Sequence, residues 1–253
     1  MSLFLKHNYS VLLPYYKKRV SIIDALKSVL EQTILPFEII LIEDSKEKIF
    51  DKEYFLNKLD FNDVHLKLYK NSKNIGLAKS LNFGLEKVET NLIFRIDDDD
   101  LYFKNHAETY LKEFNKNNNY LIYSQEIKKK FNYLNLIKDD FLIFDNLSIH
   151  SSWMINLNVN KQFRYIDLNP EDYASLSFYM RKNYKLKIIK ANTVKYNDNP
   201  DGMSKKNNAN KHIDKIRKAN FLHFKKKYIK KGLIYFLFKM FTKINVFTFF
   251  KIK

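Results

Sequence analysis

The stretch NLIFRIDDDDLY, residues 91–102, places four consecutive aspartates directly after an apolar segment. That segment has the pattern of a buried β-strand, so the aspartates stand where the strand ends. Like charges this close repel one another, and each needs a counter-charge. A divalent cation can supply it, because Mg²⁺ and Mn²⁺ prefer carboxylate oxygens. An acidic run is equally common in a solvated loop or at a helix N-terminus, so these residues alone leave both interpretations open.

The sequence around the aspartates alternates strand and helix patterns. Strands are predicted at 9–14, 37–44, 64–70, 91–96, 120–127 and 186–191, and helices at 20–32, 50–59, 76–88, 105–117 and 171–183. Residues 128–170 show no clear pattern. Alternation of this kind is typical of an α/β fold with a mostly parallel sheet covered by helices on both faces. Ligands bind such sheets at the carboxyl ends of the strands, which are the loops at 14–18, 43–47 and 97–100.

Composition predicts one large domain with a basic tail. The chain has 253 residues, 45% of them apolar, and a net charge of +17. Residues 204–253 hold 15 Lys and Arg against one acidic residue, so residues 1–203 carry only +3. We expect one folded domain at 1–205, made of two halves at 1–102 and 103–205. The tail, 206–253, is predicted to be helical and to bind an anionic surface, either membrane or nucleic acid.

Several sequence features indicate where the protein works. It has no cysteine, which excludes disulfides and thiolate metal sites. The N-terminus lacks a signal-peptide pattern, and the longest apolar run, 232–238, is far shorter than the roughly 20 residues of a spanning helix. We therefore expect a cytoplasmic protein. In the tail, basic residues alternate with aromatic ones, as in helices that lie at a membrane surface. The alternative is a helix that packs on the domain formed by residues 1–205.

The motifs of residues 9–102 occur in a recognisable order. A strand is followed by a helix ending in QT (32–33), a strand ending in ED (43–44), the segment NIGLAKSLN (74–82), and a strand ending in DDDD (97–100). This order resembles family 2 glycosyltransferases. Arg95 and the segment VKYNDNPDGMS (194–204) look most like the amylovoran-type galactosyltransferase branch.

The resemblance implies a GT-A fold that binds a nucleotide-sugar donor, usually a UDP-sugar, with Mn²⁺ or Mg²⁺. Asp44 matches the acid that hydrogen-bonds uracil, and Pro14 and Tyr15 border the base and ribose. Lys79 is a candidate nucleotide contact, or else a solvated helix lysine. In the aspartate run, Asp97 and Asp99 form the D-x-D motif, with Asp99 as the main metal ligand. Asp98 is expected to face the nucleotide, and Asp100 to cap the next helix.

The same resemblance implies that 1–205 is a catalytic domain, with a nucleotide-binding half at 1–102 and an acceptor-binding half at 103–205. It also implies which residues of the second half carry the chemistry. NPEDY (169–173) matches the family's E-D motif, so Asp172 is the candidate base and Glu171 positions it or the acceptor. Alternatively, both acids simply favour a helix N-terminus. His150 matches the family segment H-x-[ST]-x-M-x-[RK] and is a candidate for the donor or acceptor pocket, although Asn156 replaces the closing basic residue. Trp153 could stack on a sugar ring or belong to the core.

These expectations favour an inverting, metal-dependent transferase that builds a bacterial surface glycan, such as lipooligosaccharide, capsule or exopolysaccharide. The donor is expected to be a UDP-sugar, with galactose suggested by the branch, and the acceptor a glycan or glycolipid. The tail is expected to hold the enzyme at the inner face of the cytoplasmic membrane. Three alternatives remain: a protein that binds nucleic acid or another anionic surface through the tail, a non-catalytic relative, and a nucleotidyltransferase, which the E-D motif and the tail fit less well. The acidic strand ends argue against a nucleic-acid partner.

Overall fold

The computed structural model describes residues 9–16, 21–46, 50–125, 148–197, 212–220 and 222–223. Predictions that fall on 17–18, 126–147, 198–211 and 224–253 lie outside this part of the chain. All structural statements below refer to the described residues.

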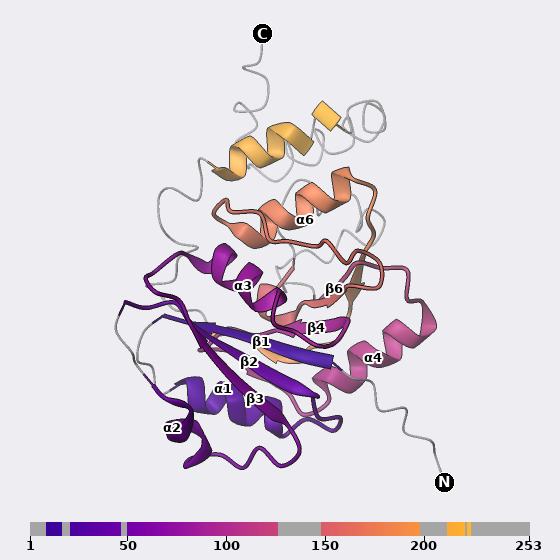
Figure 1. Ribbon diagram of the computed structural model, residues 1–253. Helices are drawn as coiled ribbons and strands as arrows, with labels where there is room; N and C mark the ends of the chain where they lie inside the picture. Colours follow the sequence, from indigo (N-terminus) through magenta and orange to yellow (C-terminus); the bar gives the residue numbers. More distant parts are fainter. Residues whose placement is uncertain are drawn as a thin grey trace.

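A seven-stranded sheet forms the centre of the protein, in the order β3-β2-β1-β4-β7-β6-β8 (Figure 1). Of its six pairings, four are parallel, and the two made by β7 are antiparallel. The predicted mostly parallel sheet is thus confirmed. A second, two-stranded sheet pairs β5 with β9. The strands are β1 Tyr9–Tyr15, β2 Glu38–Glu43, β3 His65–Lys70, β4 Leu92–Arg95, β5 Leu101–Tyr102, β6 Ile122–Gln125, β7 Met154–Asn156, β8 Leu186–Ile189 and β9 Val194–Lys195.

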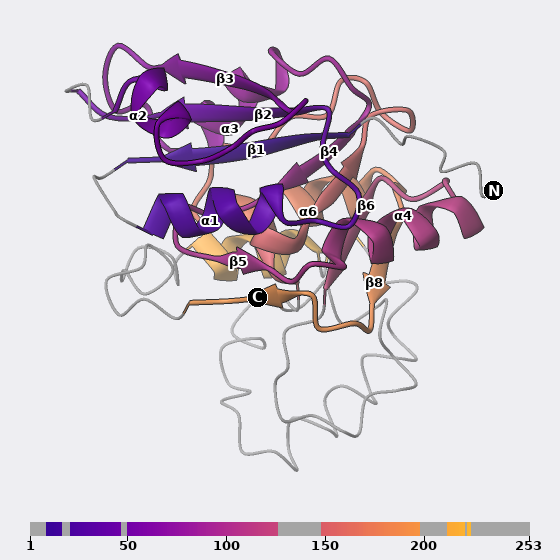
Figure 2. The ribbon, with the colours of Figure 1, turned by 90° about the horizontal axis from the view of Figure 1, so that it is seen from below.

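Helices cover both faces of the large sheet. They are α1 Ser21–Leu30, α2 Lys52–Leu56, α3 Leu77–Leu85, α4 His106–Lys116 and α6 Glu171–Arg181, with a 3₁₀ turn η1 at His150–Ser152. Buried residues of α1, α2 and α4 join one core cluster, and those of α3 join the other, together with Leu176 and Tyr179 of α6. Figure 2 shows α1 running alongside β1, with β5 on its other side.

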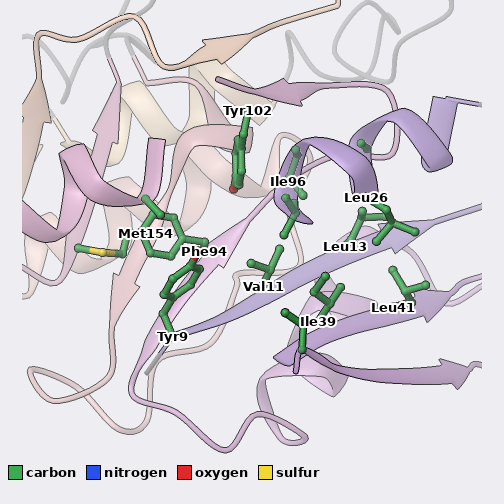
Figure 3. Packing of buried hydrophobic residues seen from close by; sticks show 14 of the residues in the cluster. Tyr9, Val11, Leu13, Leu26, Ile39, Leu41, Phe94, Ile96, Tyr102 and Met154 are labelled. Carbon is green, nitrogen blue, oxygen red and sulfur yellow. The ribbon is translucent and has the colours of Figure 1, made fainter. Parts of the chain in front are cut away.

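The two cores follow from the alternation of side chains along each strand. Odd-numbered residues of β1 and β2 pack toward α1, and the intervening Leu12, Ile40 and Ile42 pack toward α3. Both faces are therefore apolar, which explains why these strands read as continuous apolar runs. Figure 3 shows the α1 side, where Tyr9, Val11, Leu13, Ile39, Leu41, Phe94 and Leu26 meet.

Helix α3 approaches the sheet closely because residue 84 is glycine. A Cβ built on Gly84 would lie 2.3 Å from Ile42 Cδ1 and 3.2 Å from Leu12 Cδ2. A larger residue at 84 would require the Ile42 side chain to move or α3 to shift away from β1 and β2. The helix begins after Gly76, whose φ of +92° is readily adopted only by glycine.

Four short elements were absent from the sequence prediction: β5, η1, β7 and β9. They have two or three residues each, too few to show a hydrophobic period. β7 is the most consequential, since it inserts antiparallel between β4 and β6 and carries η1 next to the end of β4.

Residues 212–220 form a helix that packs against α6. Ile216 is buried with Tyr173 and Ala174, and Ile213 lies against the same cluster. Asn220 donates to Ser177 Oγ over 3.1 Å. The first part of the basic segment therefore packs on the catalytic domain, which was the alternative to membrane binding for these residues. The helices searched in the described part of the chain include none long and apolar enough to cross a membrane.

Acid is expected to destabilise the fold through His106, which is fully buried against Tyr102 and Tyr110. Burial lowers the pKa of His106 to about 3, although the contact with Thr193 opposes the shift. In the unfolded chain this pKa is about 6.5. The unfolded state thus binds the proton first, and stability falls as the pH drops from about 6.5 towards 3.

Urea unfolding at about pH 7 and about pH 5 tests this. The native chain should lose about 2 kcal/mol through His106 between these two pH values. His106→Gln, which gains no proton, should lose that much less on acidification. Equal losses in the two proteins would contradict the assignment.

Candidate active site

The candidate site lies where β1, β2 and β4 end. These strands are parallel neighbours, so their carboxyl ends lie at one edge of the sheet. Tyr15, Asp44 and the aspartate run from Asp97 all stand at this edge. The alignment of the three loops predicted from the sequence is therefore present in the fold.

An ion pair between Arg95 and Asp97 forms the base of the site. The Arg95 side chain is fully buried, and its two terminal nitrogens each donate to one oxygen of the Asp97 carboxylate. Ser151 of η1 joins them: its hydroxyl donates to Asp97 Oδ2 over 2.8 Å and accepts from Arg95 Nη1 over 3.1 Å. The end of β4 and the 3₁₀ turn η1 are thereby held together through three side chains.

Burial and charge act in opposite directions on this pair. Burial alone would lower the pKa of Arg95, but the Asp97 carboxylate raises it above its usual value. Burial alone would raise the pKa of Asp97, but Arg95, His150 and the hydrogen bond from Ser151 lower it. Asp97 therefore stays ionised, as a partly buried carboxylate with a bidentate guanidinium partner should.

Asp100 does not cap the following helix, which corrects the expectation from the sequence. Helix α4 begins after Asn105, and no side chain caps it. Asp100 Oδ1 instead accepts from the backbone N–H of Asn197 over 2.8 Å. Pairing of β5 with β9 brings residue 197 to this position, so Asp100 anchors the chain just after β9. Burial, with the nearby Asp97 and Asp99, raises the pKa of Asp100 to about 7, although the Asn197 N–H opposes the shift.

The remaining aspartates of the run bear on the expected metal. Asp98 is almost buried and Asp99 is half-buried. Both oxygens of Asp97 already accept from Arg95, and the described residues contain no group of three or more His, Cys, Asp or Glu arranged to hold a metal. Mg²⁺ often takes only one or two protein carboxylates and completes its shell with substrate phosphates and water. The residues present fit a metal of that kind, with Asp99 as the carboxylate outside the Arg95 pair.

Asp44 organises the turn that precedes α3. Its Oδ1 accepts from Asn71 Nδ2 and from the N–H of Ile75, and its Oδ2 accepts from the N–H of Gly76, all within 2.9 Å. A carboxylate offers about four acceptor positions, and three are occupied here. The uracil contact implied for Asp44 would use the fourth, and it stays a prediction.

Three other residues of the expected donor site have different surroundings. Pro14 lies within β1 beside Ile42 of β2. The Tyr15 side chain is only 3% exposed, and its hydroxyl donates to Glu43. A nucleotide contact from Tyr15 would thus use its backbone. Lys79 forms an exposed 3.1 Å ion pair with Asp167, which gives this lysine a protein partner.

His150 connects the aspartate run to the E-D motif. Its Nδ1 lies 3.4 Å from Glu171 Oε1, and both side chains are largely buried. Burial alone would raise the pKa of Glu171, but the hydrogen bond and charge of His150 lower it. Arg95 contributes to the same shift, so Glu171 and the Arg95–Asp97 pair share one electrostatic environment.

Glu171 and Asp172 begin α6, as predicted, and both acids lie in its first turn. Asp172 Oδ1 accepts from the N–H of Tyr173 over 2.7 Å, at the N-terminus of the helix. Glu171 instead points to His150. The two adjacent acids are therefore held by different partners, which suits the different roles expected of them.

Several structural contacts at the site were not foreseen. Trp153 is fully buried, which assigns it to the core. Asn156, which replaces a basic residue of the family segment, is also buried, and its amide donates to the carbonyl of Asn118. Ser151 and Tyr165 were not singled out from the sequence. Arg95 was noted only for the branch resemblance, although a charged residue inside an apolar strand, two positions before an acid on the same side, indicates a buried pair.

Comparison with known proteins decides the family. The model described as Glycosyl transferase family 2 matches residues 10–185, which is most of the chain. The protein belongs to glycosyl transferase family 2. The resemblance read from the motifs is thus confirmed, and the matched residues include every acid and the histidine discussed above.

Relatives within family 2 differ in how much of them this chain covers. An uncharacterised glycosyltransferase of Bacillus subtilis, YwdF, is 23% identical over 201 residues, covering 74% of this chain and 73% of that protein. The Escherichia coli UDP-Gal:alpha-D-GlcNAc-diphosphoundecaprenol beta-1,3-galactosyltransferase is 32% identical over 129 residues, covering 48% of this chain and 44% of that protein. This chain thus spans less than half of the latter relative.

Solved structures of other glycosyltransferases share the fold. Staphylococcus aureus TarS, residues 1–349 with UDP-GlcNAc, has a TM-score of 0.63 at 16% identity, covering 86% of this chain and 66% of that one. The Pyrobaculum calidifontis mannosyltransferase PcManGT with GDP-Man and Mn²⁺ has a TM-score of 0.61 at 16% identity, covering 87% and 64%. These likenesses confirm the predicted GT-A fold.

Removing the Arg95 guanidinium should lower the stability of the protein. Arg95→Leu leaves the Asp97 carboxylate without its counter-charge and should cost on the order of 3 kcal/mol in the free energy of unfolding. The double variant Arg95→Leu/Asp97→Leu, which removes both charges, should recover much of that loss. Urea titrations of the two variants measure both effects. An equal or larger loss in the double variant would show that the unpaired Asp97 charge does not cause the loss of stability in Arg95→Leu.

Proposed function

We propose that this family 2 protein is an inverting, metal-dependent glycosyltransferase. It transfers a hexose, with galactose as the first candidate, from a UDP-sugar to a hydroxyl of a lipid-linked bacterial glycan. The observation that carries the proposal is the continuity of the site. The aspartate run after β4 and the E-D pair that begins α6 meet through Ser151 and His150 of a single 3₁₀ turn.

The donor is proposed to bind along the ends of β1, β2 and β4. Asp44 and the backbone of Pro14 and Tyr15 would contact the base and ribose. Asp99, with Asp97 held beside it, would hold Mn²⁺ or Mg²⁺ together with the donor diphosphate. A bound metal would neutralise charge that develops on the departing diphosphate. Asp98 would lie on the nucleotide side of the metal.

The acceptor is proposed to approach from the start of α6. In the reaction, the acceptor hydroxyl oxygen bonds to the anomeric carbon while the bond from that carbon to the diphosphate oxygen breaks. UDP leaves with the electron pair, and the hydroxyl proton passes to Asp172. Direct displacement of this kind inverts the anomeric configuration. Glu171, kept ionised and oriented by His150, would position Asp172 or the acceptor.

Relatives support the substrate classes. The E. coli galactosyltransferase is named for UDP-Gal and a GlcNAc-diphosphoundecaprenol acceptor, and a second E. coli relative, WfgD, for UDP-Glc and the same acceptor. TarS has been solved with UDP-GlcNAc and with UDP. A UDP-sugar and a lipid-linked glycan are therefore the substrates to test first. The acceptor would place the enzyme at the cytoplasmic face of the membrane, held there by the basic segment 206–253.

Two Asp→Asn substitutions, at residues 172 and 99, separate the proposed role of general base from that of metal ligand. Asp172→Asn removes the proton acceptor, so transfer from UDP-galactose to a synthetic GlcNAc-diphospholipid should fall by at least about a hundredfold while UDP affinity is kept. Asp99→Asn should instead weaken UDP binding in the presence of Mn²⁺. Turnover assays and calorimetric titration with UDP give the two quantities. Near-normal turnover of Asp172→Asn would show that another group is the base.

Membrane attachment is testable with the whole chain. We expect it to sediment with vesicles that contain phosphatidylglycerol and not with vesicles of phosphatidylcholine alone, because each basic residue near an anionic surface contributes about 1 kcal/mol. Raising the salt concentration should release it. Equal partition between the two kinds of vesicle, or displacement by DNA at low concentration, would argue for a different role of the basic segment.

A further inference from the structure

One face of α3 contacts the segment that leads to the E-D motif. Three polar contacts join them in antiparallel order: Glu86 lies 3.9 Å from Arg164, Asn82 bonds to Tyr165, and Lys79 pairs with Asp167. Spacings of three and four residues place all three helix residues on one face. The two outer contacts are exposed ion pairs, which contribute little. The central contact, from Asn82, is therefore the one that fixes the register.

Asn82 forms hydrogen bonds with both the backbone N–H and the backbone carbonyl of Tyr165. Its Oδ1 accepts from the Tyr165 N–H over 2.7 Å, and its Nδ2 donates to the Tyr165 carbonyl over 2.9 Å. This pattern reproduces the hydrogen bonds of a paired strand, although residue 165 lies outside the sheet strands. Asn82 is the last residue of the NIGLAKSLN segment, and no role in the site has been given to it so far.

Tyr165 passes this constraint to His150. The Tyr165 ring is 2% exposed and lies 5.4 Å, centroid to centroid, from the His150 ring. The Tyr165 ring also stacks on the Trp153 ring. The Trp153 ring in turn meets the His150 ring edge-on, with 4.8 Å between their centroids. His150 Nε2 has no hydrogen-bond partner among the described residues. The direction in which Nδ1 faces Glu171 is thus set mainly by the packing of two aromatic rings.

A second route runs from the same segment to the first turn of α6. The N–H of Ile166, the next residue after Tyr165, donates to Ser175 Oγ over 2.8 Å. That hydroxyl donates to the carbonyl of Glu171 over 2.6 Å. Moving the backbone at 165–166 would therefore shift Glu171 through its own main chain as well as through His150.

We propose that Asn82 is a positioning residue for transfer: by holding the Tyr165 backbone, it fixes the His150–Glu171 pair against the Arg95–Asp97 pair. It couples a helix of the donor half to the acids of the acceptor half without contacting a substrate. The expected effect of Asn82 on turnover rests on the proposed function. The expected effect of Asn82 on the packing around Trp153 is independent of that function.

The test compares Asn82→Ala with Asn156→Ala. Asn156 is a matched control, because its amide also bonds to backbone, at Asn118 and Tyr120, and at the opposite end of β4 from the aspartates. Asn82→Ala should lower kcat for UDP-galactose with the GlcNAc-diphospholipid on the order of tenfold to a hundredfold, since small displacements near reacting groups have effects of this size. The affinity for UDP should stay the same, and Asn156→Ala should keep the kcat of the native chain.

Trp153 provides a readout that needs no substrate. It is the single tryptophan of the chain and is fully buried against His150 and Tyr165. Acrylamide should quench its fluorescence more strongly in Asn82→Ala than in Asn156→Ala, at equal losses of thermal stability. Equal quenching in the two variants, or equal kcat values, would overturn the proposal. If the native chain transfers no sugar, the proposed function fails, and the quenching comparison alone decides whether Asn82 holds this packing.

Discussion

Arg95 carries a full charge into the interior of the protein, at the point where the central strand β4 ends. A buried guanidinium is tolerated only when a carboxylate and further acceptors surround it. Asp97 and Ser151 accept from its two terminal nitrogens, whereas Nε has no partner among the described residues. The backbone N–H of Arg95 donates to the Trp153 carbonyl over 3.0 Å. The requirement brings the turn η1, and with it His150, against the end of β4. Because His150 faces Glu171, the start of α6 is drawn to the same place.

Four identical residues in a row acquire different properties from this arrangement. Asp97 is bound by Arg95, and Asp100 is bound by the Asn197 N–H. The ion pair lowers the pKa of Asp97, whereas burial raises that of Asp100 to about 7. Asp99 lies between them at intermediate exposure. Adjacent carboxylates that point into different surroundings need not share one function, and only some of the run is left to meet a metal and a diphosphate.

Sequence patterns predicted most of the fold, because strands buried on both faces and amphipathic helices leave clear periods. They missed β7, the short strand that inserts antiparallel between β4 and β6 and brings η1 and His150 next to the end of β4. They also assigned Asp100 to a helix cap, since the pairing of β5 with β9 that brings Asn197 to it joins residues almost a hundred positions apart. Local pattern contains no information about such contacts.

At the site, residue types were easier to predict than partners. The acids at 44, 97–100 and 171–172 stood out by their place after strands or before a helix. That Asp44 binds a turn, that Tyr15 faces the core, and that Asn82 holds Tyr165 depends on side-chain directions in the folded chain. The ion pair of Lys79 was not predicted for the same reason, since its partner Asp167 lies in a segment without a readable pattern.

A thermal-shift titration with UDP, with and without Mn²⁺, tests most directly whether the aspartate run is a nucleotide-diphosphate site, with GDP and CDP as controls. A ligand that binds only the native state adds about 2.7 kcal/mol of stability at a hundredfold excess over its Kd. The account predicts a rise in Tm that is selective for UDP, needs Mn²⁺, and is much reduced in Asp99→Asn. No shift with any nucleotide, or a shift in Asp99→Asn equal to that of the native chain, would contradict it.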